Sequence, residues 1–280
     1  METRPFGPTG VRVPVIGLGT WQMEGDDRAA AIRALRTGLD LGMKHVDTAE
    51  LYGSGQVEEL VGEAIQGRRD EVFLVSKVVP SNASRQGTIK SCEKSLKLLR
   101  TDRLDCYLLH WPGSHPLEDT IAALEELSAS GKIRSWGVSN FDEDELAEVV
   151  RIAGPGKLTC NQVLYHLGER GIEHAVLPWC EREKVAVVGY TPFGRARFPP
   201  RSPAGEVLST IAEKRGATPR QIALAFLTRR PSLFAIPKSS DAEHVRQNAE
   251  AAALELSADE LESLEKAFPL GRRRSGVAMI

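Results

Sequence analysis

A regular alternation of short apolar runs and longer amphipathic segments sets the narrowest limit on how this chain can fold. Eight runs of four to six mostly apolar residues have the character of strands buried on both faces. They lie at residues 15–19, 44–47, 72–76, 104–109, 133–138, 158–163, 185–189 and 233–236. Helical spacing of apolar residues separates them, for example over 26–41, 88–99 and 117–127. Strict alternation of strand and helix predicts a parallel sheet.

Eight such units in 280 residues predict a closed (β/α)8 TIM barrel of the α/β class. The rival is a doubly wound dinucleotide-binding sheet, whose fingerprint is GxGxxG after the first strand. Here Gly17 and Gly19 are followed by Gln22 where the third glycine would stand. No linker rich in proline, glycine or serine divides the chain. We therefore predict a single domain over residues 1–280.

Two segments fall outside the eight units. Residues 4–15 predict a short N-terminal β-hairpin with Gly10 near its turn, placed to plug the bottom of the barrel. Residues 257–267 predict an extra C-terminal helix that starts with a Ser257/Glu260 capping box. The last ten residues, 271–280, contain three adjacent arginines and are expected to form a flexible end.

Charge and cysteine content exclude several classes of protein. There are 36 Lys and Arg against 38 Asp and Glu, a net charge of −2, which argues against a nucleic-acid binder or a polybasic membrane anchor. The four cysteines form no CxxC pair, so we expect free thiols and no metal site. No secretory signal or apolar run of about 18 residues occurs. A reduced cytoplasm is therefore the expected compartment, and a monomer is expected because nothing in the sequence suggests an obligate assembly.

Polar residues at the predicted strand ends form a chemically coherent set. Asp47 ends the second strand, with Tyr52 just beyond it, Lys77 ends the third strand, and His110 follows the fourth. The C-terminal strand ends of a barrel share one face, where active sites form. An ammonium beside a tyrosine lowers its pKa, and a carboxylate can hold that ammonium. Such a set would protonate an oxygen that gains charge as hydride reaches carbon, which requires a nicotinamide cofactor.

Four motifs occur in order along the chain, together with the strand-end Lys77. They are Asp47–Tyr52 (DTAELY), Leu104–Pro112 (LDCYLLHWP), Gly131–Phe141 (GKIRSWGVSNF) and Ile236–Ser239 (IPKS). With these motifs the chain resembles the aldo-keto reductases over nearly its whole length. The resemblance is strongest to the short bacterial members that reduce small aldehydes such as methylglyoxal.

The resemblance implies a role for each matching position. Tyr52 would be the general acid, tuned by Lys77 and Asp47, and His110 would orient the carbonyl. Trp21 and Trp111 would join Tyr52 and His110 around the substrate. The implied cofactor-binding residues are Gly19, Thr20, Trp21, Asp47, Ser139, Asn140, Gln162, Tyr190, Thr191, Pro192, Phe193, Lys238, Ser239, Ser240, His244 and Asn248. Lys238 and Ser239 would bind the adenosine 2′-phosphate, which favours NADPH, with NADH as the alternative.

The chain departs from the family pattern near this phosphate. The arginine that usually stands six residues after the IPK lysine is His244, and a usual glutamate is Gln247. Histidine is mostly neutral at pH 7 and lacks the guanidinium fork. We therefore expect weaker discrimination in favour of NADPH, with Arg246 as a candidate substitute. A longer stretch after Tyr52 also leaves open whether Glu58 has its usual supporting role.

The function expected is NADPH-dependent reduction of aldehydes or ketones, with a small-molecule carbonyl as partner and neither nucleic acid nor membrane. Two other classes stay open. A redox-sensing regulatory protein would bind NADPH with little turnover, and a (β/α)8 lyase or isomerase would need no nicotinamide. Steady NADPH oxidation with a panel of aldehydes separates them. Short mouth loops favour an open pocket for small or varied carbonyls, without naming one.

Overall fold

The computed structural model describes all 280 residues, and at its centre lies an eight-stranded parallel sheet. The strands follow the chain from one edge to the other. They are β3 (Leu18–Gly19), β4 (His45–Asp47), β5 (Phe73–Val78), β6 (Cys106–Leu109), β7 (Trp136–Ser139), β8 (Leu158–Leu164), β9 (Ala186–Tyr190) and β10 (Leu233–Ile236). Parallel bridges from Ile16 to Ala235 and from Gly19 to Lys238 join the two edges. The predicted (β/α)8 barrel is confirmed.

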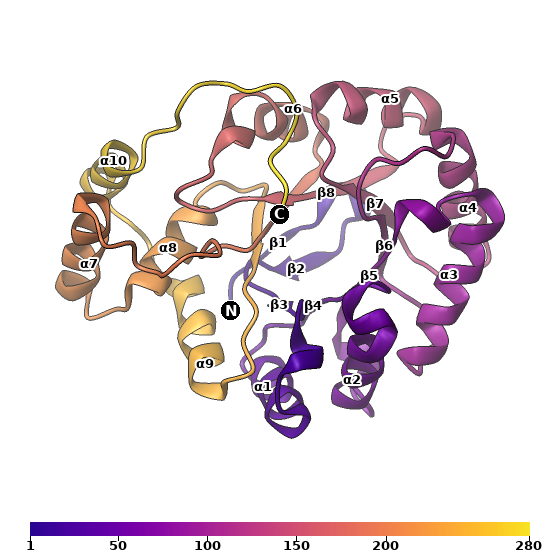
Figure 1. Cartoon of the computed structure of the whole chain (residues 1–280), viewed down its shortest axis with the longest axis horizontal. Coiled ribbons are helices and arrows are strands. Elements are labelled where there is room, and N and C mark those ends of the chain that lie inside the picture. The colour runs from indigo at the N-terminus through magenta and orange to yellow at the C-terminus, as the bar shows by residue number, and fades with distance from the viewer.

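Helices surround the barrel, as Figure 1 shows looking down on the strand ends. They are α1 (Arg28–Asp40), α2 (Gln56–Ala64), α3 (Arg85–Leu98), α4 (Leu117–Ala129), α5 (Glu143–Ala153), α6 (Val176–Glu183), α7 (Pro203–Arg215), α8 (Pro219–Leu227), α9 (Ala242–Glu250) and α10 (Ala258–Ala267). The capping box of Ser257 and Glu260 starts α10 as predicted. The connection from β9 to β10 contains both α7 and α8, so the protein has one helix more than the eight predicted units and the C-terminal helix provide.

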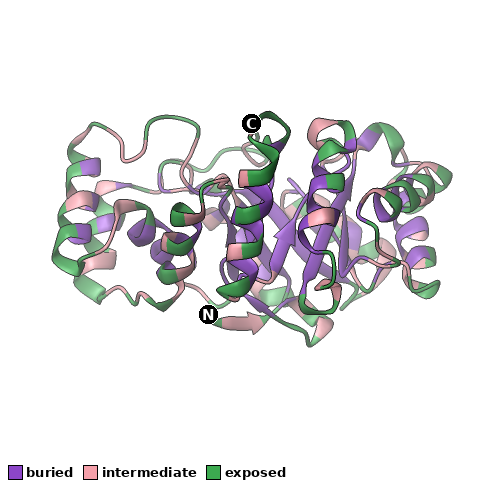
Figure 2. Ribbon diagram, turned by 90° about the horizontal axis from the view of Figure 1, so that it is seen from below, coloured by how far each residue is buried: buried purple, intermediate pink, exposed green.

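The N-terminal hairpin is also confirmed. Strands β1 (Thr3–Pro5) and β2 (Arg12–Pro14) pair antiparallel, and Gly10 adopts the left-handed conformation, with φ of 72°, in the turn between them. Phe6 at the end of β1 is fully buried, and its ring lies 4.9 Å from Phe73 and 5.1 Å from Phe234. The hairpin therefore closes the N-terminal end of the barrel, at the lower side of Figure 2.

The inside of the barrel is filled with side chains. Alternate residues of the strands, among them Val75, Leu108 and Val188, form an apolar cluster with Phe6. A larger cluster fills the space between the strands and the helices, and Figure 2 shows the strands of the barrel almost entirely buried. All four cysteines are buried and free. Because the barrel is packed solid, ligands can enter only at the C-terminal ends of the strands.

The tail after α10 is not the free end that the sequence suggested. It crosses from α10 to the barrel axis, and the chain ends above the strands (Figure 1). Arg273 contacts Glu143 of α5, and Arg274 lies 3.9 Å from Glu169. These contacts place the tail over the barrel mouth. None of the ten helices has the length and apolarity needed to span a membrane.

Candidate active site

The four predicted catalytic residues meet at the mouth of the barrel. Asp47 is the last residue of β4, Lys77 lies near the end of β5, and His110 directly follows β6. Parallel register sets these residues side by side, since Asp47 pairs with Val75 and Lys77 with Leu108. Tyr52 begins a 3₁₀ turn that leads from β4 into α2. The expectation that these side chains share one face is therefore met.

Lys77 is the centre of this group. Its side chain is 0% exposed, and its Nζ donates to Asp47 Oδ1 at 2.6 Å, to the Thr48 carbonyl at 2.8 Å and to Tyr52 Oη at 3.3 Å. An ammonium has three hydrogens, and these three acceptors use all of them. Asp47, itself only 2% exposed, supplies the opposite charge that a buried ammonium requires.

The charges on this group follow from burial and pairing. Burial raises the pKa of Tyr52, and the nearby Lys77 ammonium opposes this shift without cancelling it. The sequence predicted that Lys77 lowers the pKa of Tyr52. Lys77 does act in this direction, but burial has the larger effect, so the pKa of Tyr52 is raised. Burial tends to lower the pKa of Lys77, but Asp47 and Tyr52 together raise it. At neutral pH the phenol therefore keeps its proton beside a fixed positive charge.

His110 is a neutral histidine. Burial, helped by the Lys77 ammonium, lowers the pKa of His110 to about 2. Its ring stands edge-on to the Tyr52 ring at 5.9 Å between centroids, and its Nδ1 has no hydrogen-bond partner within the protein. A neutral imidazole donates one hydrogen bond and accepts another. His110 can therefore orient a carbonyl oxygen beside Tyr52 without adding charge.

A chain of amides and hydroxyls extends from Asp47 across the ends of β7, β8 and β9. Gln162 Nε2 donates to Asp47 Oδ2 at 2.7 Å, and Ser139 Oγ donates to the Gln162 carbonyl at 2.8 Å. Asn140 Nδ2 donates to Ser139 Oγ at 3.1 Å, and the Tyr190 hydroxyl donates to Asn140 Oδ1 at 2.9 Å. The predicted nicotinamide-binding residues Ser139, Asn140, Gln162 and Tyr190 thus form one network with the Asp47 carboxylate.

A cavity of about 250 Å³ opens above these residues. All four predicted substrate residues line it: Trp21, Tyr52, His110 and Trp111. Most of the predicted cofactor residues line it too, namely Gly19, Thr20, Trp21, Asp47, Ser139, Asn140, Gln162, Tyr190, Thr191 and Lys238. The cavity runs from Tyr52 to Lys238. The residues predicted to bind the nicotinamide and the lysine predicted to bind the 2′-phosphate therefore line the same space.

The other predicted cofactor residues do not line this cavity: Pro192, Phe193, Ser239, Ser240, His244 and Asn248. Phe193 packs against Phe198 at 5.3 Å between ring centroids. His244 is exposed on α9, and Asn248 is buried one turn further along the same helix. Pro192 and Phe193 follow Thr191 in the chain after β9, whereas Ser239, Ser240, His244 and Asn248 lie in the chain after β10 that also carries Lys238.

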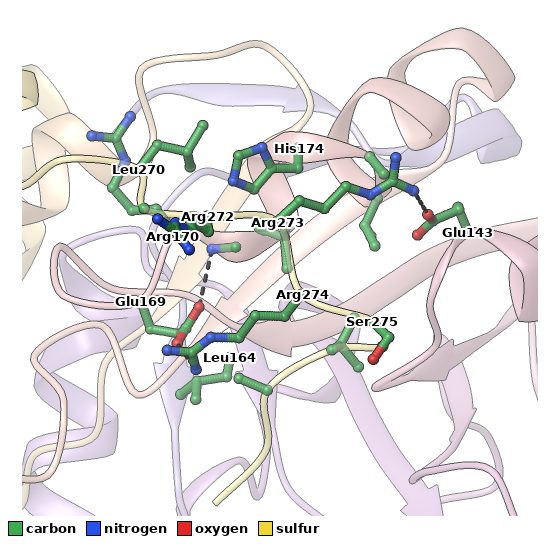
Figure 3. Close-up of a pocket in the computed structure, with 18 of the residues that line it drawn as sticks. Glu143, Leu164, Glu169, Arg170, His174, Leu270, Arg272, Arg273, Arg274 and Ser275 are labelled. Carbon is green, nitrogen blue, oxygen red and sulfur yellow. Dashed lines mark hydrogen bonds and ion pairs between the residues drawn. The ribbon is translucent and has the colours of Figure 1, made fainter.

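Four residues of the cavity wall were not predicted from the sequence: Leu51, Ile236, Met279 and Ile280. The last two, Met279 and Ile280, lie in the C-terminal tail. They reach it because the tail is held on the barrel by the arginines described above. Figure 3 shows the neighbouring cavity of about 280 Å³ beneath the tail, with Arg273 directed toward Glu143. No local pattern in the tail indicates this path, which depends on contacts with distant residues.

Glu58, whose role the sequence left open, lies behind Lys77. It is fully buried in α2, and its Oε1 accepts a hydrogen bond of 2.6 Å from Ser76 Oγ. Burial raises the pKa of Glu58. Since Ser76 precedes Lys77 on β5, Glu58 anchors the strand segment that carries the lysine.

A closed barrel whose mouth joins a half-buried tyrosine to a buried lysine, a buried aspartate and an amide network defines a class, the barrel-type oxidoreductases. A family model described as "Aldo/keto reductase family" matches residues 15–268, and the chain belongs to this family.

Similar proteins agree with this assignment. The chain is 44% identical to methylglyoxal reductase YeaE of Escherichia coli over 96% of both chains. It is 32% identical to a glyoxal reductase of Bacillus subtilis, over 91% of this chain and 89% of the relative. An aldo/keto reductase of Klebsiella pneumoniae, solved in complex with NADP and acetate, superposes with a TM-score of 0.92 at 42% identity, covering 100% of both chains.

Proposed function

We propose that this protein reduces aldehydes or ketones to alcohols with NADPH, that its substrates are small carbonyls such as methylglyoxal, and that Tyr52 is the general acid. The observation that carries the proposal is the position of the Tyr52 hydroxyl, 3.3 Å from the buried Lys77 ammonium and open to the cavity. The names of the relatives, which include methylglyoxal and glyoxal reductases, support the same activity.

The residues around the cavity fit a nicotinamide cofactor. Hydroxyl and amide groups of Ser139, Asn140 and Gln162 complement a carboxamide, and the Tyr190 ring beside them offers a flat apolar surface. At the other end, Lys238 supplies a cation for the adenosine 2′-phosphate. NADP and NADPH complexes of the Klebsiella pneumoniae structures support the choice of cofactor. NADPH, when bound, supplies hydride to the carbonyl carbon.

The protein's own residues handle the proton. Neutral His110 donates a hydrogen bond to the carbonyl oxygen and holds it near Tyr52. The Tyr52 hydroxyl transfers its proton to that oxygen as negative charge develops there, and the C=O bond becomes an alcohol. Lys77 stabilises the tyrosinate left behind, while Asp47 keeps the ammonium in place. A proton from solvent then restores Tyr52.

The dimensions of the site favour small substrates. A cavity of about 250 Å³ must hold both the nicotinamide ring and the substrate. Ligand sites for drug-sized molecules are usually larger, about 300–1,000 Å³. Trp21 and Trp111 wall the space, and Met279 and Ile280 narrow it further. A carbonyl compound of a few heavy atoms, such as methylglyoxal, fits these limits.

Replacing Tyr52 by phenylalanine tests the proposal. Tyr52→Phe should bind NADPH as the parent does, measured by fluorescence quenching, and should lose about 10²- to 10⁴-fold in the rate of NADPH oxidation with methylglyoxal. Tyr107→Phe is the matched control, because the Tyr107 hydroxyl is buried without a hydrogen-bond partner and lies outside the cavity. Full activity in Tyr52→Phe would refute the mechanism. If the parent protein binds NADPH tightly but does not turn over any aldehyde, the alternative of a redox-sensing regulatory protein is favoured.

A further inference from the structure

The cation predicted to hold the 2′-phosphate already has a partner. The Lys238 ammonium contacts Asp26 Oδ2, and the Ser240 hydroxyl donates a hydrogen bond to the same oxygen. Asp26 lies in the segment between β3 and α1, far from Lys238 in sequence but facing it across the edge where β3 and β10 meet. Both side chains of the ion pair are about one-third exposed, so the pair is neither buried nor fully screened.

The second source of anion-binding groups nearby is also occupied. The N-terminus of α9 follows directly after Ser240, and its first free N–H groups would ordinarily attract a phosphate. The Asp241 carboxylate caps this helix and accepts hydrogen bonds from the backbone N–H groups of Glu243 and His244. The hydrogen-bond donors that a phosphate would need here are therefore already bound to two carboxylates, those of Asp26 and Asp241.

The surrounding side chains do not compensate for these negative charges. His244 stands where an arginine would give a fixed positive charge, and Arg246 is paired with Glu243 at 3.2 Å. Asp26 itself stays ionised. Burial tends to raise the pKa of Asp26, but the hydrogen bonds from Lys238 and Ser240 outweigh burial and lower it. A carboxylate in this position repels a phosphate and accepts a hydrogen bond from a free hydroxyl.

We infer that Asp26 is a specificity-determining residue that weakens the preference of this protein for NADPH and admits NADH as an alternative cofactor. The inference rests on the proposed function, in which Lys238 faces the cofactor's 2′ position. A 2′-phosphate must displace Asp26 from Lys238 and stay close to its charge. A 2′-hydroxyl leaves the ion pair in place and adds no charge.

Substitution of Asp26 by asparagine removes the charge and keeps the shape and the acceptor for Ser240. We expect Asp26→Asn to tighten the binding of NADPH about five- to tenfold, as removal of one partly screened charge contact implies, and to change the binding of NADH less than twofold. Glu24→Gln is the matched control, since Glu24 is an exposed carboxylate of the same segment that contacts neither Lys238 nor Ser240.

Binding of 2′,5′-ADP, measured by titration calorimetry, isolates the phosphate site from the nicotinamide and from catalysis. A gain with Asp26→Asn for 2′,5′-ADP and NADPH, and none with Glu24→Gln, supports the inference. Unchanged binding in Asp26→Asn, or equal changes for NADPH and NADH, overturns it while leaving the proposed function intact. If the parent and Asp26→Asn both bind neither NADPH nor 2′,5′-ADP, the proposed function and the inference both fail.

Discussion

Replacing Lys77 by methionine should separate the structural and chemical effects of the buried charge. Methionine fills similar space but leaves the Asp47 carboxylate, 2% exposed, with only the Gln162 amide as partner. Removing one member of a buried ion pair costs about 3–5 kcal/mol, because the other charge remains uncompensated. For a domain of this size that loss corresponds to a fall in Tm of about 5–8 °C. Thermal unfolding followed by circular dichroism measures it.

Lys77→Met should also lower the rate of catalysis, independently of its effect on stability. Lys77 is the group that opposes the effect of burial on the Tyr52 pKa, so Lys77→Met should raise this pKa further and leave the tyrosinate unstabilised. We expect kcat for methylglyoxal reduction to fall by about 10²-fold or more, with NADPH binding nearly unchanged.

A double variant, Asp47→Leu with Lys77→Met, removes both charges and completes the test. It should recover most of the lost stability, short of the parent by about 1 kcal/mol because the Gln162 amide loses its acceptor. It should recover no activity. The reasoning is refuted if Lys77→Met unfolds at the temperature of the parent, or if the double variant is no more stable than Lys77→Met alone.

Three further predictions concern stability and the cavity wall. Burial lowers the pKa of His45 to about 4, so below pH of about 6.5 the unfolded chain binds a proton at this site that the folded chain does not. His45 should therefore contribute about 2 kcal/mol to the loss of stability on going to pH of about 5, in addition to the loss from the buried His110. The fall should be weaker by about this amount in His45→Gln, and equal slopes in the two proteins would contradict this. Deleting residues 279–280 should raise kcat/KM for a bulky aromatic aldehyde relative to methylglyoxal several-fold, and an unchanged ratio would exclude a role for the tail in substrate choice. In Gly137→Ala the new Cβ would lie 2.6 Å from the Cys160 carbonyl oxygen, so denaturant unfolding should show a loss of about 1–3 kcal/mol, whereas Gly25→Ala, with no atom within 4 Å, should be nearly neutral.

The barrel could be predicted because its strands are buried on both faces and therefore appear as uninterrupted apolar runs. The eight predicted units allow one helix between β9 and β10, whereas the structure has two, although local signals mark the first of them, α7. Ser202 caps its start, Pro203 occupies its first turn, and Gly216 ends it in the left-handed conformation. A count of one helix for each strand could not reveal a connection that contains two helices.

The convergence of Asp47, Tyr52, Lys77 and His110 could be predicted because the strand ends of a barrel meet at one face whatever the intervening sequence. The direction in which the pKa of Tyr52 shifts could not be predicted, because it depends on how far the side chain is buried in the folded protein. The tail residues Met279 and Ile280 and the partner of Lys238 also escaped prediction. Each depends on contacts between segments that are distant in sequence, and no periodicity or spacing records such contacts.

One carboxylate, that of Asp47, links the two halves of this site. Its Oδ1 accepts from Lys77 and its Oδ2 accepts from Gln162. A ligand that binds the Gln162 amide changes the hydrogen bond from Gln162 to Asp47, and so changes how strongly Asp47 attracts the Lys77 ammonium. Because Lys77 contacts the Tyr52 hydroxyl, the pKa of Tyr52 changes too. In the proposed mechanism, the bound nicotinamide and the Tyr52 proton donor are therefore linked through the two hydrogen bonds on the Asp47 carboxylate. Substitution of Gln162 should therefore shift the pH profile of turnover as well as the affinity for the cofactor, because the two parts of the site are electrostatically coupled through Asp47.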